Sequence, residues 1–460
     1  MQHLWAWKYR YERRNCEVMQ IVSLFPGEAI TYCASPEVIK QLLSDSVKYV
    51  KPPRALTIGV MGPNVASLNG ERWRTHRKVT SPAFDNQIYN DVWRVAAGLY
   101  KEMVNSTPWK SGDKHYFRSF NVFTTRLALL VITSCGFNLK VDWEGALMRE
   151  GFDGPLDSTI VNVASGLLPR IIFPKWAFKL PLKFLQANDK SFTALDSFLN
   201  SEVSSKKAEL LNEKILNILD TPNKNLFTRV VISSMVEGSK GLSDNEIIGN
   251  LIFYLFAGHE TTASALVTTL ALLAINQEEQ QRIHDYIIDA IGMHDPEYAN
   301  YEDLAPVLHS FYEAIRLYPP GPIILRVPTE DTVLTAPQAI SGSNSLSMPR
   351  GQEIVIDFIA AGRNARVYKD PSAFHPRRWA SSDLSADDII FFGAGPRTCL
   401  GKKFSMTESV CFLTHALRDW RFDVKLENGE TRAGWQERIM RPFIGVTMKI
   451  DDIPLLVTRR

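Results

Sequence analysis

Helical patterns of apolar and polar residues dominate this chain. Apolar residues that recur every three or four positions predict amphipathic helices over 36–43, 87–103, 201–219, 278–290 and 304–318. Pro319 and Pro320 end the last of these, because a residue before proline avoids helical backbone angles. A further helical pattern covers 401–417. The chain is therefore expected to be mainly helical.

Short apolar runs between turn residues predict a smaller β part. Residues 18–24 and 29–33 flank Pro26-Gly27 and predict a hairpin. Later runs that could add small sheets lie at 332–334, 353–358 and 443–448. The serine-rich stretch 341–348 predicts a surface loop. We expect one domain over 1–460, mainly α with small β-sheets. Its helical core would span 70–420, with a minor β lobe near 18–33 and C-terminal strands.

One stretch, residues 247–275, is long and apolar enough to raise the question of a membrane span. A capping box from Ser243 to Glu246 predicts where its helix begins. A helix buried in a large core is equally apolar all round. His259 and Glu260 at its middle would be costly in lipid. The sequence therefore favours a core helix and keeps a spanning helix as the alternative.

The composition argues against several classes of protein. Lys and Arg number 52 and Asp and Glu number 50, so the net charge of +2 gives no case for a nucleic-acid partner. The first fifteen residues are too charged for a signal peptide, and the chain as written is expected to carry no transmembrane anchor. The cysteines are odd in number and form no CxxC pair, which argues against a disulfide scaffold or structural zinc: Cys16, Cys33, Cys135, Cys399 and Cys411.

The stretch around Cys399 is the most informative part of the sequence. It reads Phe392-x-x-Gly395-x-Arg397-x-Cys399-x-Gly401. A thiolate ligand needs nearby positive charge, which Arg397 supplies, and it gains from the N-terminus of a following helix. Glycines let the backbone pass close to a flat cofactor. The pattern favours a metal-binding thiolate over a buried cysteine beside a glycine turn.

This stretch resembles the haem-binding loop of the cytochrome P450 superfamily, and the chain resembles its fungal-like, microsomal-type members. The resemblance implies the cytochrome P450 fold and heme b, iron protoporphyrin IX. It implies that Cys399 is the axial ligand of the iron, that Phe392 packs beside the sulfur and that Arg397 pairs with a haem propionate. Thiolate ligation favours cleavage of the O–O bond.

Other basic residues match the family's propionate-binding positions. Trp73 and Arg77 are four apart on a presumed helix and therefore share a face. An indole N–H and a guanidinium are good donors to a carboxylate. Arg326 resembles another such position. Without the other motifs, the pattern of Trp73 and Arg77 would fit a basic, exposed helix end equally well.

The middle of the long apolar stretch reads Ala257-Gly258-His259-Glu260-Thr261-Thr262. Its small residues leave room beside the helix, and Thr261 can bend the helix by bonding back to a carbonyl. The run resembles the family's oxygen-activation motif, which implies that Glu260 and Thr261 relay protons as catalytic residues. The alternative is a helix kink with a satisfied acid. His259 is expected to be structural and to point away from the haem.

A structural cluster is expected around Glu313. Glu313 and Arg316 lie three apart on one helix face and can pair, and taken alone they suggest a solvated ion pair. The resemblance implies instead a buried pair with Arg378 as the third partner. The family usually has an acid where Arg377 stands, so the pairing of Arg377 stays open.

The resemblance implies an oxidoreductase acting on paired donors, a monooxygenase that inserts one atom of O2 into a lipophilic small molecule. The aliphatic residues expected around the pocket suit a terpenoid or another secondary metabolite. The chain has no dinucleotide fingerprint, so NADPH is expected to act indirectly, through a cytochrome reductase. We expect that reductase to dock on a basic face formed by Arg74, Lys78, Lys402 and Lys403.

Basic and aromatic residues in 167–185 suggest peripheral contact with a membrane, and the resemblance suggests the surface of the endoplasmic reticulum. A core-facing amphipathic loop is the alternative for this segment. For the whole chain, one alternative is a haem-thiolate isomerase or peroxygenase that uses Cys399 without a reductase. The other is a non-catalytic haem-binding protein.

Overall fold

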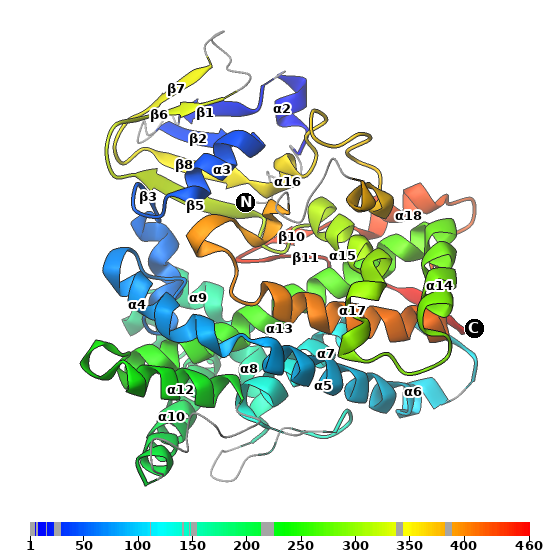
Figure 1. Ribbon diagram of the computed structural model, residues 1–460, viewed down its shortest axis with the longest axis horizontal. Helices are drawn as coiled ribbons and strands as arrows, with labels where there is room; N and C mark the ends of the chain where they lie inside the picture. Colours follow the sequence, from blue (N-terminus) through cyan, green and yellow to red (C-terminus); the bar gives the residue numbers. More distant parts are fainter. Residues whose placement is uncertain are drawn as a thin grey trace.

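The computed structural model describes residues 5, 8–14, 16–22, 29–110, 112–139, 142–146, 148, 154–212, 225–336, 344–381 and 389–460. Helices make up most of this part of the chain, and the larger sheet lies at one end of the molecule (Figure 1). The predicted class, mainly α with small β-sheets, is confirmed.

The helices carry most of the packing. In chain order they are α2 (Arg10–Arg13), α3 (Pro36–Ser44), α4 (Gly70–Thr80), α5 (Asn86–Val104), α6 (Thr107–Lys110), α7 (Asn121–Phe137), α8 (Leu156–Ser165), α9 (Leu167–Ile172), α10 (Lys183–Asn212), α12 (Leu226–Val236), α13 (Asp244–Ile275), α14 (Gln277–Ile291), α15 (Ala305–Leu317), α16 (Phe358–Ala361), α17 (Lys402–Asp419) and α18 (Arg432–Ile439). Short 3-10 turns that matter below are η1 (Pro53–Met61), η3 (Lys175–Lys179) and η7 (Pro376–Ala380).

The strands form four small sheets. The largest has the order β1-β2-β8-β5-β3, in which β2 and β8 run parallel and the other pairs are antiparallel. Its strands are β1 (Val18–Val22), β2 (Ala29–Cys33), β3 (Tyr49–Val50), β5 (Ile323–Pro328) and β8 (Glu353–Asp357). The others pair β6 (Thr332–Thr335) with β7 (Ser345–Met348), β10 (Phe443–Ile444) with β11 (Met448–Lys449), and β12 (Leu455–Arg459) with β4 (Lys114–Phe117) and β9 (Trp420–Asp423).

Helix α13 is the centre of the fold. It runs for 32 residues, most of them buried, and packs most extensively against α7. Its capping box from Ser243 to Glu246 is present as predicted. The interpretation of 247–275 as a core helix is therefore confirmed. Within the described residues, no helix combines the length and the apolarity that crossing a bilayer requires.

Some elements differ from the sequence prediction. The stretch 443–448 forms a tight hairpin of β10 and β11, because the chain reverses at 445–447. The predicted loop 341–348 ends in strand β7, since its serines pair with β6, while 341–343 lie outside the described residues. Residues 201–212 of the helix expected over 201–219 are the C-terminal end of α10, and 213–219 also lie outside the described residues.

Candidate functional site

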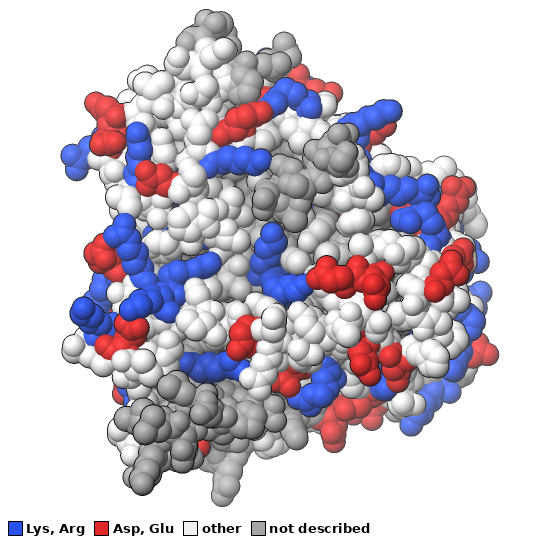
Figure 2. Space-filling model, viewed as in Figure 1, with Lys and Arg blue, Asp and Glu red and all other residues white. Residues whose placement is uncertain are grey.

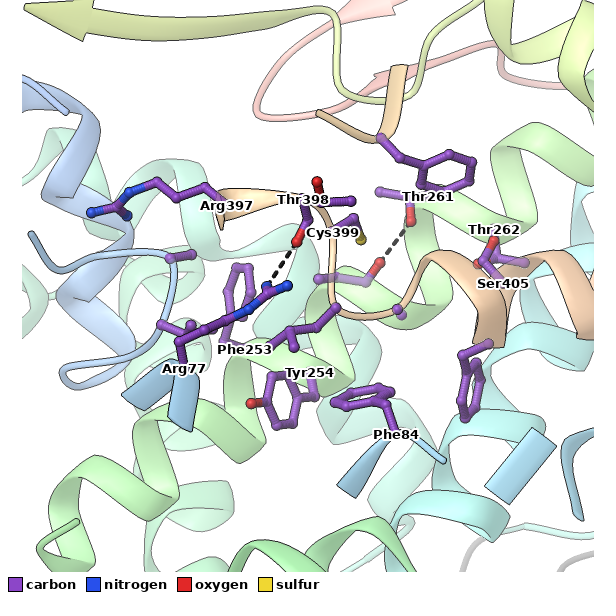
Figure 3. A pocket seen from close by; sticks show the side chains of 18 of the residues that line it. Arg77, Phe84, Phe253, Tyr254, Thr261, Thr262, Arg397, Thr398, Cys399 and Ser405 are labelled. Carbon is purple, nitrogen blue, oxygen red and sulfur yellow. Dashed lines mark hydrogen bonds between the residues drawn. The ribbon is translucent and has the colours of Figure 1, made fainter. Parts of the chain in front are cut away.

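A cavity of about 230 Å³ lies between α13, α4 and the segment that leads into α17 (Figure 3). Its wall is mainly apolar, and it joins elements that are far apart in the sequence. The aromatic and aliphatic lining includes Val65, Phe84, Ile132, Phe253, Leu400 and Phe404. The polar lining includes Lys51, Arg77, Thr261, Thr262, Arg397, Cys399 and Ser405.

Cys399 lines this cavity at the end of a closed loop. The backbone N–H of Cys399 donates to the carbonyl of Phe392 at 2.9 Å, and Phe392 lines the same cavity. The thiol is open to the cavity although protein packs densely around it. This burial raises the pKa of the Cys399 thiol, while a backbone hydrogen bond at Gly401 and the charges of Arg77 and Lys402 act to lower it. Arg77 on α4 and Lys402 at the start of α17 thus supply the positive charge that a thiolate ligand needs, a role that the sequence suggested for Arg397.

Gly395 fixes the path of this loop. It has a φ of +64°, and a Cβ there would lie 2.4 Å from the carbonyl oxygen of Leu43 at the end of α3. The sequence suggested that the glycines allow a close approach to a cofactor. At Gly395 the close approach is to the protein's own backbone, which anchors the loop on α3.

Trp73, Arg77 and Arg397 lie together beside the cavity. The guanidinium of Arg397 stacks on the Trp73 ring at 4.1 Å and donates to the carbonyl of Leu68 at 3.0 Å and to Oδ1 of Asn69 at 3.1 Å. Nε of Arg397 is buried and has no hydrogen-bond partner among the described residues. Arg77 donates to the carbonyl of Thr398 at 2.7 Å (Figure 3).

Two further cations extend this group. Arg326 on β5 is buried and donates to the carbonyl of Leu325, and burial lowers its pKa to about 10. Lys51 lines the cavity and donates to the carbonyl of Ala66, and its pKa falls to about 7 through burial and the charges of Arg397 and Arg326. Lys51 was not predicted from the sequence, because a lysine before two prolines in a loop carries no periodic signal.

The four cations Lys51, Arg77, Arg326 and Arg397 form no ion pair with any described carboxylate. Arg326 is buried and the other three are partly buried, and charges withdrawn from water without a counter-charge are costly. The group would therefore gain from an anionic ligand beside the cavity. Haem fits this requirement, because its two propionates supply two negative charges and its iron takes a thiolate ligand such as Cys399.

The opposite wall of the cavity belongs to α13. Thr261 Oγ1 donates to the carbonyl of Ala257 at 2.7 Å, and Thr262 Oγ1 donates to Oγ of Ser405 at 3.0 Å (Figure 3). A Cβ on Gly258 would lie 3.1 Å from Ile132 Cγ1, so this glycine brings α13 close to α7. The structure therefore places Thr261 on the cavity wall, with its hydroxyl hydrogen-bonded to the helix carbonyl four residues earlier.

Glu260 and His259, which precede Thr261, do not line the cavity. Glu260 is outside the cavity lining and hydrogen-bonds with the side chain of Thr447, and burial raises the pKa of its carboxyl. His259 is buried outside the lining, with Nδ1 2.6 Å from the carbonyl oxygen of Leu255. Of the two expected relay residues, the cavity is in contact with Thr261 alone.

Glu313, Arg316 and Arg378 meet in a buried cluster. Arg316 donates to both carboxylate oxygens of Glu313 at 2.7 and 2.8 Å, and Nε of Arg378 donates at 2.9 Å. Trp379 Nε1 adds a donor at 3.0 Å. Arg377 does not join them but pairs with Glu279 of α14 at 3.1 Å. The cluster ties α15 to η7 and lies apart from the cavity lining.

Comparison with known proteins identifies relatives along nearly the whole chain. Residues 8–447 match the family described as Cytochrome P450. Cytochrome P450 monooxygenase 124 of Postia placenta is 27% identical, over 99% of this chain and 88% of that protein. Cytochrome P450 monooxygenase ORF6 of Penicillium roqueforti is 26% identical, over 91% of this chain and 78% of that protein.

A plant enzyme is similar at the same level. Secologanin synthase 1 of Catharanthus roseus is 26% identical, over 85% of this chain and 73% of that protein. The family match covers the helix that carries Trp73 and Arg77, the α13 motif and the Cys399 loop. The protein is a cytochrome P450 monooxygenase, and the chain belongs to the cytochrome P450 family.

Proposed function

We propose that this chain holds heme b through Cys399 and inserts one atom of O2 into a lipophilic small molecule, such as a terpenoid or another secondary metabolite. One observation carries the proposal. The thiol of Cys399 opens into an apolar cavity that Thr261 also lines, beside four cations that no described carboxylate neutralises. When bound, haem would supply the activation of dioxygen.

The residues of the chain would hold the cofactor and deliver protons. Arg77, Arg326, Arg397 and Lys51 would bind the propionates. The Thr261 hydroxyl gives its hydrogen to Ala257, so its lone pairs can accept a hydrogen bond from inside the cavity. Burial raises the pKa of the Glu260 carboxyl, which favours its protonated form, and Glu260 would supply protons from one residue beside Thr261.

The apolar wall of the cavity would contact the porphyrin and, on the side of α13, a lipophilic substrate. Phe84, Ile132, Phe253 and Ala257 line it without a carboxylate among them. Apolar walls with a few polar groups bind ligands mainly by removing apolar surface from water. Spectral titration with a panel of terpenoids and of small charged compounds tests the substrate class. Binding of charged compounds alone would contradict it.

Electrons would come from an NADPH-dependent reductase that docks on the face carrying α4 and α17. Basic side chains gather over α4 on that face (Figure 2). Arg74, Lys78 and Lys403 already contact Glu71, Glu237 and Glu302, whereas Lys402 forms no ion pair with a described residue. Lys402 is therefore the most available of the predicted docking residues.

Charge reversal tests this docking face. Lys402→Glu, alone or with Lys403→Glu, should slow turnover driven by the reductase more than peroxide-driven turnover, because only the first needs association and any effect of the Lys402 charge on Cys399 acts on both. Arg421→Glu, at an exposed arginine of β9, is a matched control. Equal loss of both activities would contradict the role of Lys402.

We also propose peripheral contact with the membrane of the endoplasmic reticulum through α9, η3 and the start of α10. Ile172, Trp176 and Phe184 are 63%, 65% and 56% exposed, and Lys175, Lys179 and Lys183 lie among them. Apolar side chains beside lysines suit an anionic lipid surface. Trp176→Ser should reduce co-sedimentation with anionic vesicles, whereas Met293→Ser, at another exposed apolar residue, should not.

Haem ligation and turnover separate the alternatives. A carbon monoxide difference spectrum of the reduced protein should show thiolate ligation, and Cys399→Ser should abolish it. Product masses from the terpenoid panel should then require NADPH and a reductase. Turnover with neither a reductase nor added peroxide would favour the isomerase, and turnover with peroxide but none with NADPH and a reductase would favour the peroxygenase. Haem binding with no turnover would favour a non-catalytic haem-binding protein.

A further inference from the structure

A buried polar network joins α4 to α13 outside the cavity. His76 and Asn250 are both 0% exposed. His76 Nε2 lies 2.9 Å from a carboxylate oxygen of Glu246, and His76 Nδ1 lies 2.8 Å from Nδ2 of Asn250. Because an amide nitrogen is a donor, Nδ1 accepts, and the pattern places the imidazole proton on Nε2. Both ring nitrogens are thus satisfied.

Asn250 passes this contact to the loop that precedes α4. Its Oδ1 accepts from the backbone N–H of Val65 at 2.9 Å, and its Nδ2 also donates to the carbonyl of Glu246 at 2.7 Å. The loop lies directly on the helix backbone at this point, since a Cβ on Gly249 would lie 2.4 Å from the carbonyl oxygen of Pro63. The position of Val65 is therefore set by α13.

The same loop holds two of the four cavity cations. The carbonyl of Ala66 accepts from Nζ of Lys51. The carbonyl of Leu68 and the side chain of Asn69 accept from Arg397, at 3.0 and 3.1 Å. These bonds use the carbonyls of Ala66 and Leu68 and the side chain of Asn69, and their places depend on the Val65 anchor earlier in the loop.

We propose that His76 and Asn250 are positioning residues, which hold the loop 64–69 where it directs Lys51 and Arg397 toward the carboxylates of the bound cofactor. The inference rests on the proposed function, because it takes the anionic ligand to be haem. His76 and Asn250 lie outside the cavity lining and act through the loop. Their loss would weaken the hold on the propionates and leave the thiolate ligand in place.

The test uses the full haem-loaded chain and the rate at which haem transfers to an excess of haem-free globin. Asn250→Ala removes the acceptor for Val65, and we expect about tenfold faster haem loss. Lys51→Met should have a similar effect. Thr269→Val is the matched control, because it also removes a buried hydrogen bond on α13, and its rate should equal that of the wild type.

A double variant that combines Asn250→Ala with Lys51→Met distinguishes positioning from general destabilisation. If Asn250 acts through Lys51, the double variant loses haem no more than about twice as fast as the faster single variant. Independent effects would multiply to about a hundredfold, and that result would overturn the inference. A wild-type chain that binds no haem would overturn the proposed function, and the inference with it.

A pair of His76 variants keeps the inference testable if Asn250→Ala does not fold. An asparagine side chain can place its oxygen near the position of Nδ1, whereas glutamine reaches the position of Nε2. His76→Asn should therefore keep haem loss within about threefold of the wild type, and His76→Gln should accelerate it about tenfold. Equal rates for the two variants would overturn the positioning role.

Discussion

Replacing Glu313 by Gln tests the physics of the buried cluster. The Glu313 carboxylate is 0% exposed and accepts from Arg316, Arg378, Trp379 and the backbone of His375, between 2.7 and 3.0 Å. Glutamine keeps the shape but removes the negative charge. It also turns one acceptor into a donor that faces arginine donors.

The expected cost follows from the two arginines left behind. Arg316 is fully buried and the Arg378 side chain is 8% exposed, so neither charge can be solvated in place. Removing one partner of a buried ion pair costs about 3–5 kcal/mol. With about 2.1 cal/mol/K of unfolding entropy per residue, the 460 residues give about 1 kcal/mol/K. The melting temperature should therefore fall by about 3–5 °C.

Glu71→Gln provides the matched control. Glu71 and Arg74 have the same spacing of three on a helix, but their side chains are 82% and 50% exposed. Exposed pairs contribute below about 1 kcal/mol. Urea unfolding followed by circular dichroism measures both variants on one scale. The reasoning is refuted if Glu313→Gln costs no more than Glu71→Gln.

Three further predictions concern charge and backbone. Burial raises the pKa of Glu408 to about 8, so the free energy of unfolding of the wild type should fall as pH rises from about 4 to 8. Glu408→Gln lacks this titration, so its stability relative to the wild type should increase by up to about 1.4 kcal/mol per pH unit in urea melts. Gly395→Ala should lower haem content and melting temperature, because φ is +64° and Leu43 blocks a Cβ, whereas Gly429→Ala, with open space at its Cβ, should keep its haem. The Lys51 pKa of about 7 should rise when carboxylates bind beside it, so haem binding at pH 8 should be accompanied by proton uptake. Calorimetry in buffers of different ionisation enthalpy measures this uptake, which should be smaller for Lys51→Met. A wild-type stability that does not change from pH 4 to 8 would contradict the first prediction, and full haem content in Gly395→Ala the second. Equal proton uptake by the wild type and Lys51→Met would contradict the third.

Local chemistry explains what the sequence could predict. The Cys399 loop can be recognised from the sequence because its glycines, Arg397 and the thiol lie within ten residues. The face shared by Trp73 and Arg77 follows from helix spacing alone. Helix α13 is predictable because its capping box and apolar run are local signals.

Tertiary contacts account for most of what the sequence left out. Helix α7 is buried on nearly every side, so it has no amphipathic period to detect. Lys51 joins the cation group only because the fold brings a loop against the cysteine segment. The partner of Arg377 is Glu279, almost a hundred residues earlier in the chain, and no local pattern indicates it.

The group of four cations near Cys399 links the supply of cofactor to the amount of protein. Like charges in a poorly solvated place repel one another until a dianion arrives. A ligand that binds only the native state stabilises it by mass action. Protein made faster than haem is delivered would stay less stable and be open to proteolysis. The abundance of the enzyme in a cell should therefore follow the haem supply, even where its transcription is constant.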